Sequence, residues 1–459
     1  MNKKKTLISL NLVLAILCGA GSLGSIKAQG TTSNLTKAQA VNLAQTNNIN
    51  ALKINTAFST INRNITKYQE LSSEIVNLQS GFQQYKTAYG SLSPSEVSIY
   101  TLFNQTEPSK RTEVITATLK GYGYSDAQIA GTLQKLSSLN AAGMQLKAAG
   151  LTDSSLKPRE LTPELQYEKF VYPREVPVVI AKNMLKKAEL QKETINCALD
   201  VKVKEGYDAI LYGQEGYSLT QKLYDKQLKD YSQLTSKYQV GVVSEVEKDI
   251  AELELKKSKL QLDNLDRDVK NGKLQLKQSL GTDIHIEYNF TDEKLAPGEL
   301  LTYNQYLANA KSSRGEILAA AIDIEEKQYI FDLVKNYYNE DELEYKQADQ
   351  KLSEAKANYT EISNEVESNI QNSYLEVQQK LSAMQLADTK LQQAEVQYNS
   401  VKTSYETGLM TIAMMWNVEL GVNQAEMNQS KAQRDYNNAM YKLEQNSKIG
   451  TTYVMEGVN

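Results

Sequence analysis

Residues 231–246 read YSQLTSKYQVGVVSEV, and residues 398–413 read YNSVKTSYETGLMTIA. In both stretches a Tyr-x-x-Gly pattern is followed by a hydroxyl residue, Ser244 after Gly241 and Thr411 after Gly408. Glycine is favoured just after the end of a helix, and serine or threonine just before the start of the next one. Each stretch therefore predicts a tight turn that joins two long helices into a hairpin.

The two stretches belong to an internal repeat with an offset of 167 residues. Tyr207 corresponds to Tyr374, and the run Arg267-Asp268 corresponds to Arg434-Asp435. Both copies open with Leu-Thr, at residues 35 and 301, but this offset is 266, so the first copy is longer by 99 residues. Such self-similarity indicates a tandem duplication, with the excess inserted before about residue 175. We expect the recurring Arg-Asp pairs to form ion pairs between helices, and a role in gating is the alternative.

Large side chains recur every seven residues along both copies. They predict a helix-packing seam made of Tyr217, Tyr224, Tyr231 and Tyr238 in the first copy, and of Leu391, Tyr398 and Tyr405 in the second. A sustained seven-residue period is typical of helices that supercoil around their neighbours. An ordinary long coiled coil would have the same period, and this alternative stays open.

The returning helix of the first copy carries two apolar stripes. One stripe consists of Leu253, Leu260 and Leu274, and the other of Leu255, Leu262, Val269 and Leu276. Two stripes on one helix indicate neighbours on both sides, as expected in a closed ring of helices.

Proline is scarce and unevenly placed. Six of the 7 prolines lie between residues 94 and 177. A proline inside a helix costs about 3 kcal/mol, so the proline-free stretches permit helices over residues 178–239 and 343–405. The pattern predicts an all-α fold of long antiparallel helical hairpins in two tandem repeats.

The composition argues against several kinds of site. A net charge of −4 does not indicate a nucleic-acid partner, which would want a basic excess. With 1 His and 2 Cys, zinc sites are nearly excluded, and histidine-based catalysis would depend on His285 alone. The acidic residues Glu340, Asp341, Glu342 and Glu344 lack the spacing of a calcium loop and predict a solvated turn. We expect no catalytic residue, metal or cofactor.

Residues 1–28 have the layout of a secretory signal. Lysines at positions 3–5 precede an apolar run from Leu7 to Leu17, and small residues follow as far as Ala28. We expect export with cleavage after Ala28, or else after Gly24; an uncleaved anchor and lipidation at Cys18 are alternatives. A mean hydropathy of −0.49 argues against a polytopic membrane protein. Cys197 would then be the one remaining cysteine, expected to be buried in a helix.

The sequence resembles the TolC-type outer-membrane efflux proteins. The resemblance is carried by the tandem duplication, the opening Leu-Thr segments, the Tyr-x-x-Gly turns at 238–241 and 405–408, and Ser-Leu-Gly at 279–281. It covers about residues 35–90 and 173–450. The resemblance implies a homotrimer whose helices close into a long α-barrel, with an adaptor of the membrane-fusion type at the hairpin turns and an inner-membrane transporter as partners.

The sequence departs from this family where each copy should supply two membrane strands. Residues 329–345 of the second copy are too few for two strands of about 9–11 residues and a loop. Residues 91–172 of the first copy read as helices, with starts at Ser93 and Ser125. We therefore expect an α-barrel relative without a transmembrane β-barrel. It would lie in the outer membrane and periplasm of a diderm host, or at the wall or surface of a Gram-positive one.

The expected organisation is an export signal at 1–28, the opening helix of the first repeat at 29–90, an inserted helical cap at 91–172, the first long hairpin at 173–285, a linker at 286–300, the second repeat at 301–450 and a tail at 451–459. Apolar residues at the hairpin turns predict a docking surface for the adaptor, made of Gly241, Val242, Val243, Gly408, Leu409 and Met410. Packing of these residues against their own turns is the alternative.

The most direct functional prediction is an export or efflux conduit of the cell envelope. A structural coiled-coil envelope or surface protein without conduit activity is the alternative. An enzyme with its chemistry in residues 91–172 is disfavoured, because that stretch contains neither His nor Cys.

Overall fold

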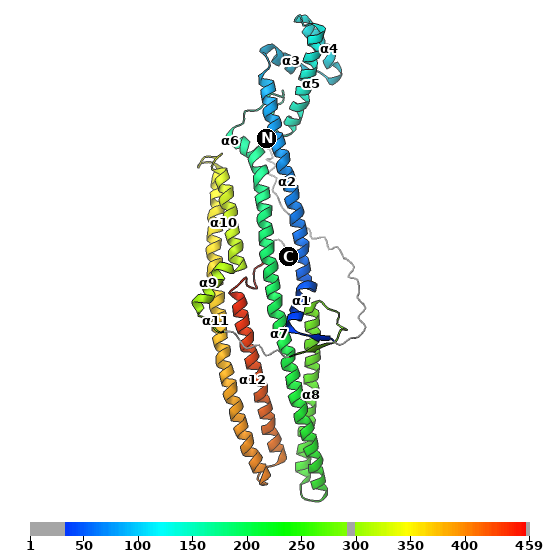
Figure 1. The fold of residues 1–459 in the computed structure, drawn as a ribbon, viewed down its shortest axis with the longest axis vertical. Helices are drawn as coiled ribbons and strands as arrows, with labels where there is room; N and C mark the ends of the chain where they lie inside the picture. Colours follow the sequence, from blue (N-terminus) through cyan, green and yellow to red (C-terminus); the bar gives the residue numbers. More distant parts are fainter. Residues whose placement is uncertain (1–32, 292–298, 456–459) are drawn as a thin grey trace, which may run out of the picture. The chain divides into compact units, whose positions relative to one another are not determined.

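A computed structural model describes residues 33–291 and 299–455 (Figure 1). In this part of the chain the regular structure consists of helices and of two strands of three residues each, β1 (Ser33–Leu35) and β2 (Tyr288–Phe290). The all-α fold class predicted from the sequence is thereby confirmed. The predicted export signal, residues 1–28, lies outside the described residues, as do parts of the predicted linker and tail.

The α-helices have these bounds: α1 (Lys37–Asn47), α2 (Ile49–Gly90), α3 (Pro94–Gln105), α4 (Arg111–Gly121), α5 (Asp126–Ala148), α6 (Pro163–Gln166), α7 (Tyr172–Gln239), α8 (Glu245–Leu280), α9 (Tyr303–Ser313), α10 (Gly315–Val334), α11 (Leu343–Glu406) and α12 (Ile412–Asn446).

The chain divides into two compact units. Unit 1 holds the described part of residues 1–57, together with 187–320 and 359–459, and unit 2 holds residues 58–186 and 321–358. The helices α2, α7, α10 and α11 contribute residues to both units.

The two longest helices, α7 and α11, each end two residues before the glycine that predicts the hairpin turn. At its other end α7 begins at Tyr172, six residues before the predicted start. A π-helical segment, Tyr167–Val171, runs directly into this start, and the Tyr172 amide donates to the carbonyl of Tyr167. Pro173 has no amide hydrogen, so it donates no bond at the junction. Pro177 removes one backbone hydrogen bond from the second turn, and the helix continues through it.

The opening helix of each repeat is broken in two at an equivalent residue. Asn48 separates α1 from α2 and Arg314 separates α9 from α10, and both residues have extended backbone, with ψ of 138° and 133°. Both openings also start with a capping box, formed by Thr36 in the first copy and Thr302 in the second. The breaks keep the offset of 266 residues, so the duplication extends to a feature that the sequence patterns did not predict.

The two short strands tie the start of the first repeat to its end. Strands β1 and β2 pair in parallel, with Leu35 opposite Phe290. The Tyr207 hydroxyl on α7 donates a hydrogen bond to the carbonyl of Leu35 (2.6 Å) and accepts one from the amide of Thr291 (3.0 Å). Tyr207 and Leu35 are both buried, so the bond between them forms out of contact with water.

Tyr207→Phe is expected to destabilise unit 1 by about 1–3 kcal/mol, because it leaves the carbonyl of the buried Leu35 without this donor and the Thr291 amide without its acceptor, while it keeps the ring. Urea denaturation followed by circular dichroism would measure the change. Tyr217→Phe, which alters a half-buried hydroxyl on the same helix, is the control. Equal stabilities of the two variants would contradict the role of the Tyr207 hydroxyl.

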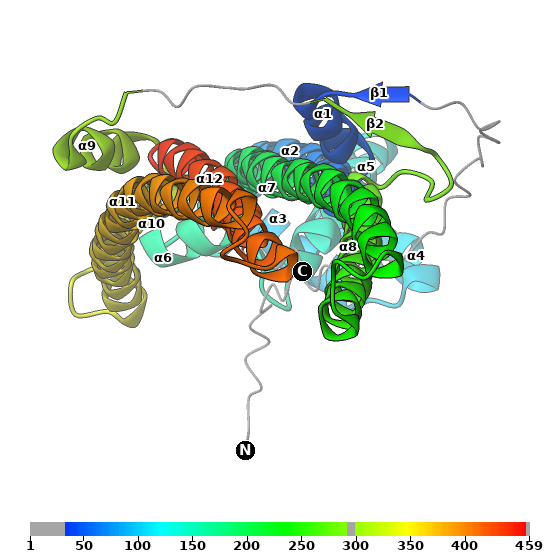
Figure 2. The same ribbon diagram turned by 90° about the horizontal axis from the view of Figure 1, so that it is seen from below.

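In unit 1, each repeat packs its opening helix onto its own hairpin. In the first copy Ala40 and Ala44 of α1 are buried with Tyr207 of α7 and Leu276 of α8. In the second copy α9 and α10 pack in the same way on α11 and α12, through a cluster of Tyr306, Ala310, Ile317, Ile370 and Leu443. The two hairpins lie side by side, and the view along them shows α11, α12, α7 and α8 following one another in a curved row (Figures 1 and 2).

Unit 2 contains the helices of residues 91–172. Their predicted starts at Ser93 and Ser125 are confirmed, since both serines form capping boxes. The helices α3, α4 and α5 enclose a core with the end of α2, in which Phe82 and Tyr85 meet Tyr100 and Phe170. The predicted turn around Glu340 and Asp341 lies between α10 and α11.

Candidate functional site: hairpin tips and charged seam

Both hairpins of unit 1 turn at a glycine with left-handed backbone, with φ of 79° at Gly241 and 78° at Gly408. At the first tip the amide of Gly241 donates to the carbonyl of Tyr238 (2.9 Å), and the amide of Val242 donates to that of Lys237 (3.0 Å). This pair of bonds is the Schellman motif, which a residue with a Cβ would strain. The second tip repeats the motif with the donor–acceptor pairs Gly408–Tyr405 and Leu409–Ser404, both at 2.9 Å. Ser244 and Thr411 cap the returning helices, as the sequence predicted.

The apolar residues of the tips fall into two groups. Val242 is 73% exposed, Leu409 is 80% exposed and Met410 is 38% exposed. Val243, in contrast, is half-buried and packs on a cluster that both hairpins share, made of Leu234, Ala251, Ile412, Met415 and Trp416. One tip residue therefore holds the turn in place, while the other three side chains present apolar surface to solvent.

The predicted seam tyrosines of the first copy are half-buried along α7. Three of them contact α8: the Lys259 ammonium lies 5.6 Å from the Tyr224 ring centre, the Tyr231 hydroxyl donates to Glu252 (3.2 Å), and the Lys248 ammonium lies 5.2 Å from the Tyr238 ring centre. Tyr217 bonds to Gln221 of its own helix (3.4 Å). In the second copy Tyr398 and Tyr405 pack on the shared tip cluster, and Leu391 is half-buried.

A row of polar and charged side chains joins the two hairpins above the tips. This charged seam consists of Asp208, Glu215, Lys226 and Asp230 on α7, and of Trp416, Glu419, Ser430 and Arg434 on α12.

The contacts of the charged seam run from helix to helix. The Lys226 ammonium lies 2.5 Å from Glu419, and the Trp416 indole donates to Asp230 (3.2 Å). Burial lowers the pKa of Lys226, but the hydrogen bond and the charge of Glu419 outweigh it, so that the pKa lies above its ordinary value. This lysine therefore carries its charge at neutral pH.

Arg434 connects α12 to two acids of α7. Its guanidinium nitrogens lie 3.6 Å from an Asp208 oxygen and 3.4 Å from a Glu215 oxygen. Asp208 is buried and is also paired with Lys37 of α1 (2.5 Å), and Glu215 accepts a hydrogen bond from Ser430 (2.6 Å). The expected inter-helix ion pair is thus present at Arg434 of the second copy.

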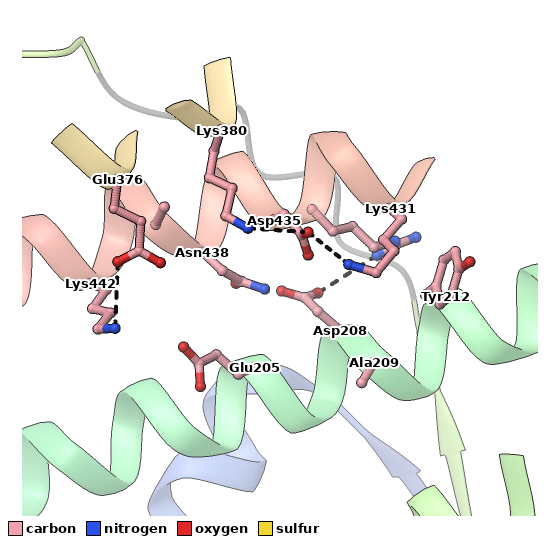
Figure 3. Close-up of a pocket in the computed structure, with 12 residues that line it drawn as sticks. Glu205, Asp208, Ala209, Tyr212, Glu376, Lys380, Lys431, Asp435, Asn438 and Lys442 are labelled. Atoms are coloured by element: carbon pink, nitrogen blue, oxygen red, sulfur yellow. Dashed lines mark hydrogen bonds and ion pairs between the residues drawn. The ribbon is translucent and has the colours of Figure 1, made fainter. Parts of the chain in front are cut away.

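A cavity of about 330 Å³ lies beside this arginine, between α7, α11 and α12 (Figure 3). Its lining carries both signs of charge, and the charges meet across helices: Lys380 of α11 lies 3.7 Å from Asp435, and Lys442 lies 3.7 Å from Glu376. Lys431 reaches Asp435 along α12 (2.7 Å). These groups hold helices together, and their balance of charge favours no ligand of one sign.

The equivalent arginine of the first copy behaves differently. Arg267 is exposed on α8 and donates to Asn264 of its own helix. The positions that would correspond to Asp208 and Glu215 are Leu375 and Ser382, so the acidic partners have no counterpart in the second copy. The repeat predicted an ion pair between helices for both arginines, because it aligns the two arginines and does not show which acids lie beside each of them.

Arg434→Ala is expected to lower the free energy of unfolding of unit 1 by about 1–3 kcal/mol, because it leaves the buried Asp208 with one cation fewer. Arg267→Ala removes an exposed side chain and should change the free energy of unfolding of unit 1 by less than about 0.5 kcal/mol. Thermal denaturation of both variants at one protein concentration provides the comparison. If Arg267→Ala destabilised the monomer as much as Arg434→Ala, the contacts of the charged seam would not explain the difference.

Other singled-out residues occupy structural positions. Cys197 is buried on α7, as predicted, and burial raises the pKa of its thiol to about 11. His285 is exposed, and its amide bonds to Asp283. Among residues 33–291 and 299–455 we find no group of three His, Cys, Asp or Glu side chains placed to hold a metal ion. No helix in that part of the chain combines the length and the hydropathy that a membrane span needs.

One buried charge was missed by the sequence patterns. Arg314, at the break between α9 and α10, is 1% exposed and pairs with Glu316 (2.8 Å). It also donates to the carbonyl of Asn446 (3.0 Å) and to the hydroxyl of Thr452 (2.9 Å) at the end of the second repeat. Asn446 and Thr452 lie more than 130 residues further along the chain, so periodicity gives no signal for these two contacts.

No known family model matches the chain, and no curated protein matches its sequence. Solved structures do match. The outer-membrane channel CmeC of Campylobacter jejuni has a TM-score of 0.51 at 14% identity, over 62% of this chain and 70% of that one. CusC, described in connection with transmembrane channel formation, has a TM-score of 0.52 at 10% identity, over 62% and 76% of the two chains. A membrane protein of Pseudomonas aeruginosa has a TM-score of 0.50 at 11% identity, over 60% and 71%.

Channel proteins thus share the fold of about three fifths of this chain, at identities that establish fold alone. The chain has the helical fold of outer-membrane channels, and the resemblance to the TolC-type proteins is confirmed at the level of the fold.

Proposed function

We propose that this protein is an export or efflux conduit of the cell envelope, built as a homotrimer and served by an adaptor and an inner-membrane transporter. The observation that carries the proposal is the pair of tandem hairpins lying side by side in a curved row, in a fold shared with channel proteins. A row of helices that curves can close on itself when further copies continue it, and a closed row encloses a passage.

The exposed apolar tips support the adaptor as a partner. Val242 and Leu409 expose 73% and 80% of their surface, at equivalent places in the two copies. Neither is needed to hold its turn, since the glycine and the hydroxyl cap do so. Apolar side chains clustered in solvent are more often a contact surface than chance would give. We therefore assign Gly241, Val242, Val243, Gly408, Leu409 and Met410 to adaptor docking.

The proposal also favours a non-enzymatic role in the envelope. The solved structures that the chain matches are channel and membrane proteins. The polar residues of the charged seam are engaged between helices of one unit. The predicted signal at residues 1–28 would deliver the chain across the inner membrane.

The experiment that tests the conduit is a measurement of the mass and shape of residues 29–459. Native mass spectrometry should give three copies, and averaged electron micrographs should show a ring with a central opening. Deletion of the gene for this protein should also lower export of a substrate of the inner-membrane transporter that is its partner. A monomer, or a solid bundle without an opening, would favour the structural envelope protein instead.

A further inference from the structure

The internal repeat allows the covered helix faces of one copy to be compared with the equivalent faces of the other, 167 residues away. Within unit 1, α12 lays one face on α7: Met427 is 7% exposed, the Arg434 side chain is 17% exposed, and the Tyr441 hydroxyl bonds to Asp200 of α7. A Cβ built on Gly216 of α7 would lie 2.5 Å from the Met427 methyl group, so these two positions face each other. This face of α12 is closed within a single chain.

The corresponding face of α8 is open. The equivalents of Met427, Arg434 and Tyr441, 167 residues earlier, are Leu260, Arg267 and Leu274. Leu260 is 66% exposed and Leu274 is 47% exposed, and Arg267 is exposed too. These two leucines belong to one of the apolar stripes that predicted a neighbour on each side of this helix. The other stripe is covered, with Leu255, Leu262 and Leu276 buried.

The face of α11 that corresponds to the covered face of α7 is open as well. Asp208, Gly216 and Leu223 of α7 are buried. Their equivalents on α11 are Leu375, which is 52% exposed, and Ala383 and Lys390, which are also exposed. Ala383 and Lys390 line a hollow of about 640 Å³ beside α12. One chain therefore has one covered contact between its hairpins, formed by α12 and α7. The two faces equivalent to that contact, on α8 and on α11, are exposed.

We infer that α8 of one copy of this chain packs on α11 of a second copy, in the register that α12 takes on α7 within one chain. The inference deepens the proposed function and rests on its ring assembly, because it names the surfaces through which the copies meet. The contact is heterologous: each copy offers α8 to one neighbour and α11 to the other, so the same step repeats around the ring. In this register Leu260 faces Ala383 as Met427 faces Gly216.

The chemistry of the contact between copies differs from that within a chain. The acids that hold Arg434 are replaced by Leu375 and Ser382, and Tyr441, which bonds to Asp200, is replaced by Leu274. At these positions the junction within a chain is ionic, and the junction between copies has apolar residues in place of an acid and a tyrosine. Since salt screens charges and leaves apolar burial intact, assembly should persist at about 1 M NaCl.

Chemical cross-linking between two single-cysteine proteins tests the register. Both carry Cys197→Ala, and one carries Leu260→Cys while the other carries Ala383→Cys. A short bis-maleimide can join the two only across a contact between copies. We expect a heterodimer band at least ten times stronger than for the control mixture, in which Glu361→Cys replaces Ala383→Cys. Glu361 is exposed on α11 but lies about 33 Å along the helix from Ala383, at 1.5 Å per residue.

The outcomes separate this inference from the function on which it rests. A strong band for the matched mixture alone supports the register. A trimer by mass with no such band, or with equal bands in both mixtures, overturns the register and leaves the conduit standing. A monomer by mass overturns both. Leu260→Asp should in addition weaken association at least tenfold without changing the melting temperature of the separated monomer. Met144→Asp, which places the same charge on an exposed apolar residue of α5, should leave association unchanged.

Discussion

Replacing Arg314 by methionine is expected to lower the free energy of unfolding of unit 1 by about 3–5 kcal/mol. The guanidinium is 1% exposed and makes four hydrogen bonds, two to Glu316 (2.8 and 3.0 Å), one to the Asn446 carbonyl and one to the Thr452 hydroxyl. Methionine fills much of the volume but leaves the Glu316 carboxylate without its counter-charge and a buried carbonyl without a donor. The Glu316 side chain is only 18% exposed, and an uncompensated charge that is largely removed from water is among the costliest defects a single substitution can make.

Urea denaturation at a fixed protein concentration measures this effect, because association would add to the apparent stability. Arg267→Met is the matched control, since it removes an arginine that is exposed on α8. The double variant Arg314→Met with Glu316→Met should recover part of the loss, because it removes both charges together. A loss below about 1 kcal/mol for Arg314→Met would mean that water replaces the lost partners and that the site is less closed than its burial indicates.

Leu409→Asp combined with Val242→Asp is expected to reduce adaptor affinity at least 100-fold while the protein keeps its fold and its oligomeric state. Both side chains are largely exposed, so their replacement costs little in the free protein. In a docked complex, however, each carboxylate would be removed from water without a partner, at a cost of several kcal/mol, and about 2.7 kcal/mol already corresponds to 100-fold.

Isothermal titration with the purified membrane-fusion-type adaptor of the same host would measure the affinity. Tyr122→Asp with Met144→Asp is the control, since both residues are exposed apolar side chains of unit 2, 65% and 55% accessible. The control should bind the adaptor as the unaltered protein does. Unchanged binding by the tip variant would remove the tips as the docking surface and take the main mechanistic support from the conduit proposal.

The sequence was informative wherever the signal is local. Glycines at the turns define the ends of α7 and α11, hydroxyl residues define the starts of α8 and α12, and the absence of proline permits the length of the long helices. The break at Asn48 escaped prediction because it depends on a distant contact: its amide group donates to the carbonyl of Ser279 (3.1 Å). The pairing of β1 with β2 escaped for the same reason, since three-residue strands carry no periodic signal.

The charged seam shows the limit of matching a chain with itself. The repeat makes Arg434 and Arg267 equivalent and predicts an ion pair for each, and for Arg434 this ion pair is present. Whether an arginine pairs depends on which acids a neighbouring helix presents, and those positions diverged between the copies. Identical residues at equivalent positions therefore have different energetic roles.

The two repeats also differ in the segment that connects the opening helices to the long helix. The first copy has the helices α3, α4 and α5 between α2 and α7, whereas the second passes from α10 to α11 through residues 335–342. A ring of three chains would thus have six hairpins but three such insertions. Its rotational order is then three and not six, however alike the hairpins look in projection. Electron micrographs averaged with sixfold symmetry would smear the insertions to half their density, and this loss measures how far the duplicated halves have ceased to be interchangeable.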